Sequence, residues 1–211
     1  MMKTGWIVTC MLGLAVAAAA QANPPVAPNL PPPGTTQNSP YGGNFELFLG
    51  GSYQAAKATS ANSVGISTTN VPGAQLALRY HVTDFNAIEF RYALAQPTQT
   101  YGNLSIKSRA SEFTFDYAWT YPSEGPIRPF LLGGLGVLHY LPIGSSNPPG
   151  TAGQSRFTLV YGGGLDLALS KQWSIRVAYR GLIYRVPDFS LIGIHKWNHM
   201  PEPALGIVFH F

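Results

Sequence analysis

The residues most able to form a functional network are nine charged side chains set at alternate positions within apolar segments. They are Glu46, Arg79, Glu89, Arg91, Glu112, Asp116, Asp166, Arg176 and Arg180. If they face a common interior, the acids and bases must pair, because an unpaired buried charge carries a large desolvation penalty. The pattern predicts that ion pairs fill this interior, which would be the plugged lumen of a closed sheet. The alternative is a narrow ion path, gated by rearrangement of the same pairs.

Two histidines near the end of the chain could be taken for metal ligands together with an acid. His195 and His199 are four residues apart, and Glu202 follows them. That spacing assembles a metal site only on a helix, whereas this stretch reads as a loop that ends at Pro201. We therefore expect a solvated loop and no metal site.

Two glycine-rich runs could be read as phosphate-binding loops. One contains Gly133, Gly134 and Gly136, and the other runs from Gly162 to Gly164. Neither has the G-x-x-x-x-G-K-S/T spacing of a phosphate loop. Close packing in a curved sheet explains them more simply, and no cofactor is expected.

The N-terminal segment has the organisation of a secretory leader. Lys3 precedes an uncharged apolar run, and Ala20-Gln21-Ala22 forms a small-x-small cleavage site. We assign residues 1–22 to a signal peptide, which would remove Cys10, the single cysteine. The mature chain would then have no disulfide, thiol nucleophile or thiolate metal site.

Residues 23–41 are rich in proline and polar residues, a composition that stays extended and cannot bury a core. We assign them to a periplasmic linker, and residues 42–211 to a membrane-embedded domain. The formal net charge is +4, and the Lys and Arg residues do not form a cluster in the sequence. We interpret it as scattered surface charge, and we expect no nucleic-acid partner.

Eight segments alternate between apolar and polar or small residues, the pattern of β-strands. They begin at or near Phe45, Gln75, Ile88, Glu112, Pro129, Arg156, Trp173 and Glu202. Most are long enough to cross a bilayer as tilted strands. The segment Pro129–Leu141 is apolar on both faces, so its orientation stays open. The fold class predicted is all-β, an eight-stranded antiparallel up-and-down transmembrane β-barrel.

The connections between these segments alternate in length. Short links run over Thr83–Asn86, Pro122–Ile127 and Ser170–Gln172, and longer ones over Lys57–Pro72, Pro97–Ile106, Pro142–Ser155 and Val186–Pro201. Short turns on the periplasmic side and long loops on the other are typical of outer-membrane barrels. Both chain ends would then lie in the periplasm.

Aromatic residues gather near the ends of the segments, as expected for two interfacial girdles. The turn side would carry Phe45, Tyr80, Phe85, Trp119, Tyr121, Phe130, Trp173 and Phe211, and the loop side Tyr53, Tyr140, Phe157 and Trp197.

The C-terminus resembles the signature by which bacterial barrels are passed to their assembly machinery, here Gly206, Phe209 and Phe211. Ala204 stands where that signature usually has a polar residue. With the leader, the alternating strands and the loop asymmetry, the chain resembles the OmpA-type outer-membrane β-barrel family. The resemblance implies a monomer in the cell outer membrane whose partners are membrane lipid, lipopolysaccharide and the barrel assembly machinery. We do not expect the peptidoglycan-binding domain that two-domain members of that family carry.

Some outer-membrane barrels are lipid A deacylases with a His-x-Ser pair near the last strands. Neither His195 nor His199 is followed by such a serine, so we predict no catalytic residues. The function expected is non-enzymatic, structural or surface-interacting, through polar loops such as Thr59–Asn70 and Gly144–Gln154. A low-conductance channel is the alternative. A lipid A-modifying enzyme is the third hypothesis, because a hydroxyl from another loop could complete a site.

Overall fold

The computed structural model describes residues 43–61, 64–123, 125–144, 147–189 and 196–211. The predicted signal peptide and linker lie outside these ranges. The elements are β1 (Phe45–Gln54), β2 (Thr59–Ala61), β3 (Val64–Thr68), β4 (Val71–His81), β5 (Asn86–Ala95), β6 (Thr98–Tyr101), β7 (Leu104–Thr120), β8 (Ile127–Pro142), β9 (Gln154–Ala168), β10 (Trp173–Arg185) and β11 (Trp197–His210). No helix long and apolar enough to cross a membrane occurs among these described residues.

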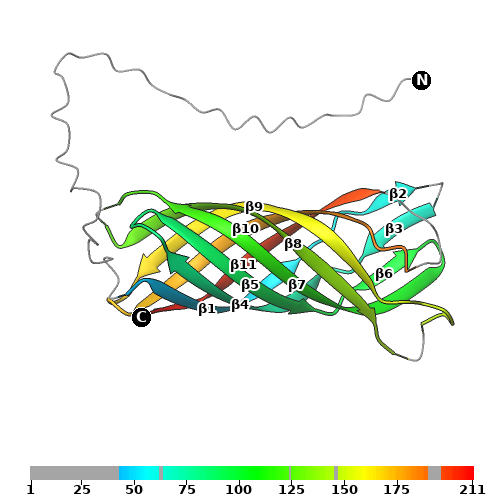
Figure 1. Cartoon of the computed structure of the whole chain (residues 1–211). Coiled ribbons are helices and arrows are strands. Elements are labelled where there is room, and N and C mark those ends of the chain that lie inside the picture. The colour runs from blue at the N-terminus through cyan, green and yellow to red at the C-terminus, as the bar shows by residue number, and fades with distance from the viewer. Residues whose placement is uncertain (1–42, 62–63, 124, 145–146, 190–195) are drawn as a thin grey trace, which may run out of the picture. The chain divides into compact units, whose positions relative to one another are not determined.

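Eight long strands close into an antiparallel barrel (Figure 1). In order around the wall they are β1, β4, β5, β7, β8, β9, β10 and β11, and β11 pairs with β1 again. Closure matters because a sheet edge facing hydrocarbon would leave its backbone groups without hydrogen bonds. The predicted eight-stranded fold is therefore confirmed.

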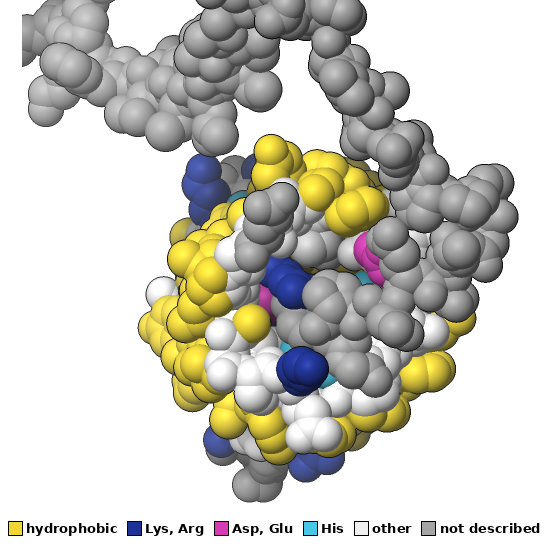
Figure 2. Space-filling model, turned by 90° about the vertical axis from the view of Figure 1, so that its left-hand side faces the viewer, with side chains coloured by type: hydrophobic (Ala, Val, Ile, Leu, Met, Phe, Trp, Pro, Cys, Tyr) yellow, Lys and Arg dark blue, Asp and Glu magenta, His cyan; other side chains and the backbone are white. Residues whose placement is uncertain are grey.

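Alternate residues along the strands face opposite environments. Leu49, Phe90 and Leu205 point outward, whereas the neighbouring Glu46, Glu89 and Arg91 are buried inside. Figure 2, which faces one end of the barrel, shows hydrophobic side chains around the perimeter and charged and histidine side chains nearer the centre. The outer wall is thus suited to lipid, and the lumen holds the charge.

The structure settles the orientation of β8. Phe130, Leu132, Leu138 and Tyr140 point into the barrel, and residues between them such as Leu131 face outward. The girdle assignments of Phe130 and Tyr140 were therefore wrong, because both rings pack in the interior. The other residues expected in the girdles are exposed on the outer wall.

The long connections contain more regular structure than the sequence suggested. The segment expected as the loop Lys57–Pro72 forms β2, β3 and the start of β4, and Pro97–Ile106 forms β6 and the start of β7. β2, β3 and β6 pair in a ladder that continues from β7 at the barrel end opposite the C-terminus (Figure 1). Cross-strand hydrogen bonds order this polar chain even though it buries few apolar side chains.

Close approach of the strands explains the glycine-rich runs. A Cβ added at Gly134 on β8 would overlap the carbonyl oxygen of Phe115 and the Asp116 carboxylate. A Cβ at the adjacent Gly133 would meet its nearest neighbour, the Val160 carbonyl oxygen, at 3.9 Å. Only the first position therefore requires the absence of a side chain.

Gly134→Ala should destabilise the barrel by about 1 to 3 kcal/mol, the usual effect of overpacking. Gly133→Ala is the matched control and should leave stability unchanged. The measurement is the urea concentration at which half of the lipid-reconstituted protein is unfolded. The folded fraction is read from the gel mobility difference between unheated and boiled samples. Equal midpoints for the two variants would contradict the packing explanation.

Candidate functional site

The candidate site is the ion network in the barrel interior. All nine predicted residues lie on inward positions of β1, β4, β5, β7, β9 and β10, and none is more than 3% exposed. They form two groups. The turn-side cluster comprises Glu46, Arg79, Glu89, Arg91, Asp166 and Arg176, and the mid-barrel cluster comprises Arg180, Glu112, Asp116 and one further acid described below.

Arg176 connects three strands of the turn-side cluster. Its Nε and Nη2 donate to the two carboxylate oxygens of Asp166 at 2.6 and 2.7 Å. Nη2 also donates to Glu46 Oε2 at 2.6 Å. Such forked guanidinium–carboxylate pairs are among the strongest hydrogen bonds in proteins. The contacts join β10 to its neighbour β9 and, past β11, to β1.

Glu89 is the carboxylate shared by three arginines. It accepts from Arg79 Nε at 2.9 Å, from Arg91 Nε at 3.1 Å and from Arg176 Nη1 at 3.3 Å. The wall beside it contributes a further hydrogen bond, from Arg91 Nη1 to Gln75 Oε1 at 2.5 Å. Loss of this one acid would leave three buried cations without a common partner.

Two phenylalanines frame the same guanidinium groups. Arg79 and Arg176 lie 4.7 and 5.0 Å from the ring centroid of Phe130, and Arg91 lies 5.1 Å from that of Phe48. Cations over aromatic faces gain electrostatic stabilisation. The two rings therefore add apolar contacts to the ion pairs of this cluster.

The mid-barrel cluster contains an acid that the sequence analysis placed elsewhere. Glu202 was considered as a metal ligand and as the start of the last strand, but not as a lumen residue. It is 0% exposed inside the barrel and accepts from Arg180 Nη1 at 2.7 Å. Arg180 Nη2 also donates to Glu112 at 2.6 Å. Glu202 is an even number of residues away from Gly206 and His210, so it faces the same side of the strand. Extending the alternation of the last strand toward its start would have found it.

His199 and Glu202, two members of the histidine–glutamate combination, face opposite sides of the barrel wall. β11 begins at Trp197, so His199 is in a strand, and the expected loop ending at Pro201 was wrong in extent. His199 Nε2 lies 2.8 Å from the Tyr161 hydroxyl on the outer wall, while Glu202 faces the lumen. His195 lies outside the described residues. Within the described ranges, no three His, Cys, Asp or Glu residues are grouped for a metal ion.

The structure also pairs a serine with a histidine that the sequence analysis did not consider. His139 Nδ1 on β8 lies 2.9 Å from Ser155 Oγ on β9, and the pair is accessible. A nucleophilic triad needs an acid to orient the imidazole. Among the residues that the structure describes, no carboxylate lies within ion-pair distance of His139.

The lumen changes character toward the loop end. Leu138, Leu182, Tyr140, Tyr184 and Phe189 belong to a buried apolar cluster there. Tyr140 lies 6.3 Å from Tyr184 and 6.5 Å from Phe189 between ring centroids. The ion pairs therefore fill one part of the interior, and a hydrophobic core fills the next.

The positive charge outside the lumen is gathered at the loop end. Six cations lie there on strand ends and connections: Lys57, Lys107, Arg109, Arg156, Arg185 and Lys196. Asp188 is the single carboxylate that the described residues place at that end, and it lies 2.9 Å from Arg156. The sequence interpretation of scattered surface charge therefore missed a polarised molecule, because residues far apart in the sequence meet at one rim.

The predicted assembly signal lies at the barrel seam. Phe45 N donates to Phe211 O at 3.0 Å, and Phe211 N donates to Phe45 O at 2.9 Å. Gly206 lies beside Gly50 on β1, and the Phe209 ring packs on Trp173. Recognition by the assembly machinery stays a prediction.

Comparison with known proteins gives one family match and several similar structures. The family model described as "outer membrane protein beta-barrel domain" matches residues 7–198. Neisserial surface protein A is 12% identical with a TM-score of 0.61, covering 80% of this chain and 97% of that one. OprG from Pseudomonas aeruginosa is 13% identical with a TM-score of 0.60, covering 80% and 96%. No curated protein sequence matches.

A third similar structure is Ail of Yersinia pestis, determined with the heparin analogue sucrose octasulfate. It is 14% identical with a TM-score of 0.54, covering 79% of this chain and 97% of that one. At these identities the likeness concerns the fold.

Glu89→Gln should destabilise the barrel by about 3 to 5 kcal/mol, because it leaves buried arginines without their shared charge. The control is Asp84→Asn, which removes a carboxylate from a turn outside the lumen. Urea unfolding in lipid vesicles measures both. If Glu89→Gln unfolds at the same urea concentration as the control, the ion network does not hold the barrel together.

Proposed function

The chain belongs to the outer membrane protein β-barrel domain family, and on that premise we propose that it is a non-enzymatic surface-interaction protein. It is an integral protein of the outer membrane. In this proposal the plugged barrel is a rigid support, and the loop end is the face that meets the environment.

The excess of cations at the loop end is the observation that carries this proposal. With the short turns in the periplasm, that end lies in the outer leaflet and beyond it. Lipopolysaccharide fills that leaflet and carries phosphate groups. Cations near an anionic membrane surface contribute favourable electrostatic energy to binding. The charge distribution thus complements the surrounding lipid.

Aromatic residues hold part of this face in place. The Arg185 guanidinium lies 5.3 Å from the Trp197 ring centroid, and Lys196 Nζ donates to the Ser60 carbonyl at 2.6 Å. A groove of about 530 Å³ beside them is lined by Lys57, Trp197 and His199, among others. A cation fixed on an aromatic ring loses less conformational entropy when it binds an anion.

Two features of the interior argue against the alternative of a low-conductance channel. The charged groups are paired across the lumen, so ions could pass only if several strong hydrogen bonds were broken. The cluster beyond them consists of aliphatic side chains and aromatic rings with only tyrosine hydroxyls among them, so it replaces the hydration of an ion poorly. A rigid plug is therefore the role that we propose for the network.

Lys57→Gln/Arg185→Gln should weaken lipopolysaccharide binding by about fivefold for each cation removed, since one cation near an anionic surface contributes about 1 kcal/mol. The measurement is the amount of lipopolysaccharide that co-purifies with the detergent-extracted protein. Lys171→Gln, which removes a charge at the turn end, should have no effect. Equal retention by all three proteins would refute the proposal.

Ser155→Ala should leave the lipid A of producing cells unchanged, because no carboxylate of the described part of the chain lies within ion-pair distance of His139. Mass spectrometry of lipid A from cells with the natural protein, with the variant and without either measures this. An acyl chain that is removed only when Ser155 is present would establish the enzyme hypothesis instead.

A further inference from the structure

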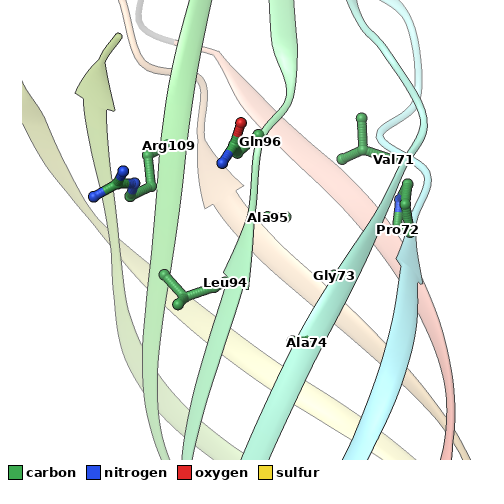
Figure 3. A pocket seen from close by; sticks show the side chains of 8 residues that line it. All are labelled: Val71, Pro72, Gly73, Ala74, Leu94, Ala95, Gln96 and Arg109. Atoms are coloured by element: carbon green, nitrogen blue, oxygen red, sulfur yellow. The ribbon is translucent and has the colours of Figure 1, made fainter.

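We propose that a notch in the outer wall between β4 and β5 binds one molecule of lipid A, with an acyl chain in the notch and a phosphate on Arg109. This inference rests on the proposed function and names a specific site within the loop-end face. Figure 3 shows the residues that line the notch.

The notch exists because the ladder between β4 and β5 is interrupted. The two strands pair as far as Gly73 and Ala95 and then separate (Figure 3). They come together again where Thr69 N donates to Thr98 O at 2.9 Å. Between these points lie Pro72 and Pro97, which have no backbone N–H to donate to a ladder. The gap is therefore specified by the sequence.

The notch has the size and lining of a site for an alkyl chain. Its volume is about 390 Å³, and Val71, Pro72, Ala74 and Leu94 contribute apolar walls. Ala74 faces outward, where its neighbour two residues along, Leu76, carries a large lipid-facing side chain. A small residue in this row leaves a depression that hydrocarbon can fill, and burial of apolar surface favours its occupation.

Two polar residues complete the lining, both on the β5 side of the gap. Gln96 follows β5, and Arg109 is an exposed residue of β7. No described carboxylate lies within ion-pair distance of Arg109, whereas each of the four lumen arginines contacts at least one. A guanidinium of this kind matches the geometry of a phosphate, with which it forms paired hydrogen bonds.

The height of the notch on the wall fits the boundary between hydrocarbon and headgroups. The next outward-facing residues on the turn side of the notch are Leu76, Tyr92 and Phe113. They pair across neighbouring strands, and their side chains form a continuous apolar and aromatic surface. Toward the loops, the outward face of β7 carries Lys107. An acyl chain against the apolar surface would place an attached phosphate beside Arg109, which makes a phosphorylated lipid the occupant that fits.

The test measures lipid bound to the full-length protein extracted from outer membranes. Native mass spectrometry would follow the titration of delipidated protein with bisphosphorylated, hexa-acylated lipid A, and separately with dephosphorylated lipid A. Arg109→Gln removes the proposed phosphate ligand, and Ala74→Leu fills the notch without changing charge. Lys171→Gln is the control, because it removes one cation at the turn end of the barrel, away from the notch and from the loop-end cations. Gel mobility before and after boiling would verify that each variant is folded.

The natural protein and Lys171→Gln should each retain one bisphosphorylated lipid A. Arg109→Gln should lower its affinity at least about tenfold, as expected for a lost charge-assisted interaction. Ala74→Leu should lower it to a similar degree, and the dephosphorylated lipid should bind as weakly to the natural protein as the phosphorylated lipid binds to Arg109→Gln.

Unchanged retention by Arg109→Gln and Ala74→Leu would overturn the notch as a site. If Lys57→Gln/Arg185→Gln still lost bulk lipopolysaccharide in that case, the proposed function would survive without this site. If that double variant also bound normally, both would be wrong. Equal binding of the dephosphorylated lipid would overturn recognition of the phosphate.

Discussion

The pairing of buried charge is the constraint on which the interior of this barrel depends. Arginine cannot give up its proton in a protein, so each buried guanidinium must meet carboxylates or carry an uncompensated desolvation penalty. Glu89 satisfies this requirement for three arginines at once, and Arg176 does so for three acids on three strands. The network therefore ties opposite sides of the wall together and leaves little freedom in their relative positions.

The remaining interior follows from that arrangement. Ion pairs occupy the lumen toward the turns, where Phe48 and Phe130 fill the space between guanidinium groups. Toward the loops the same inward rows become apolar, so the barrel combines a polar interior with a core like that of a soluble protein. Most of the cations outside the lumen lie at the loop end. They explain why the molecule has a net positive charge although its lumen holds more acids than arginines.

Much of the fold could be predicted from the sequence because the alternation of apolar and polar residues along a strand is a strong signal. Once Glu46 and Leu47 were assigned to opposite faces, every alternating strand could be oriented, and nearly all of the lumen charges could be named. Alternation carries no information where both faces are apolar, so Pro129–Leu141 could not be oriented and Phe130 was assigned to the wrong face. Glu202 was missed because Pro201 and Pro203 beside it resemble loop residues, although β11 includes both. The clustering of Lys57 with Arg185, like the notch at Gly73 and Ala95, arises from contacts between distant segments that no local pattern records.

The seam between β1 and β11 has a kinetic consequence. Its ladder joins residues from the two ends of the barrel sequence, as in the pair Glu46 and His210. Contacts of such large sequence separation form late, since the entropy of closing the intervening loop must be overcome first. Until that moment the nascent sheet has two unsatisfied borders and a charged inner surface open to water. We therefore expect closure of the barrel and desolvation of its interior to occur together at the end of folding.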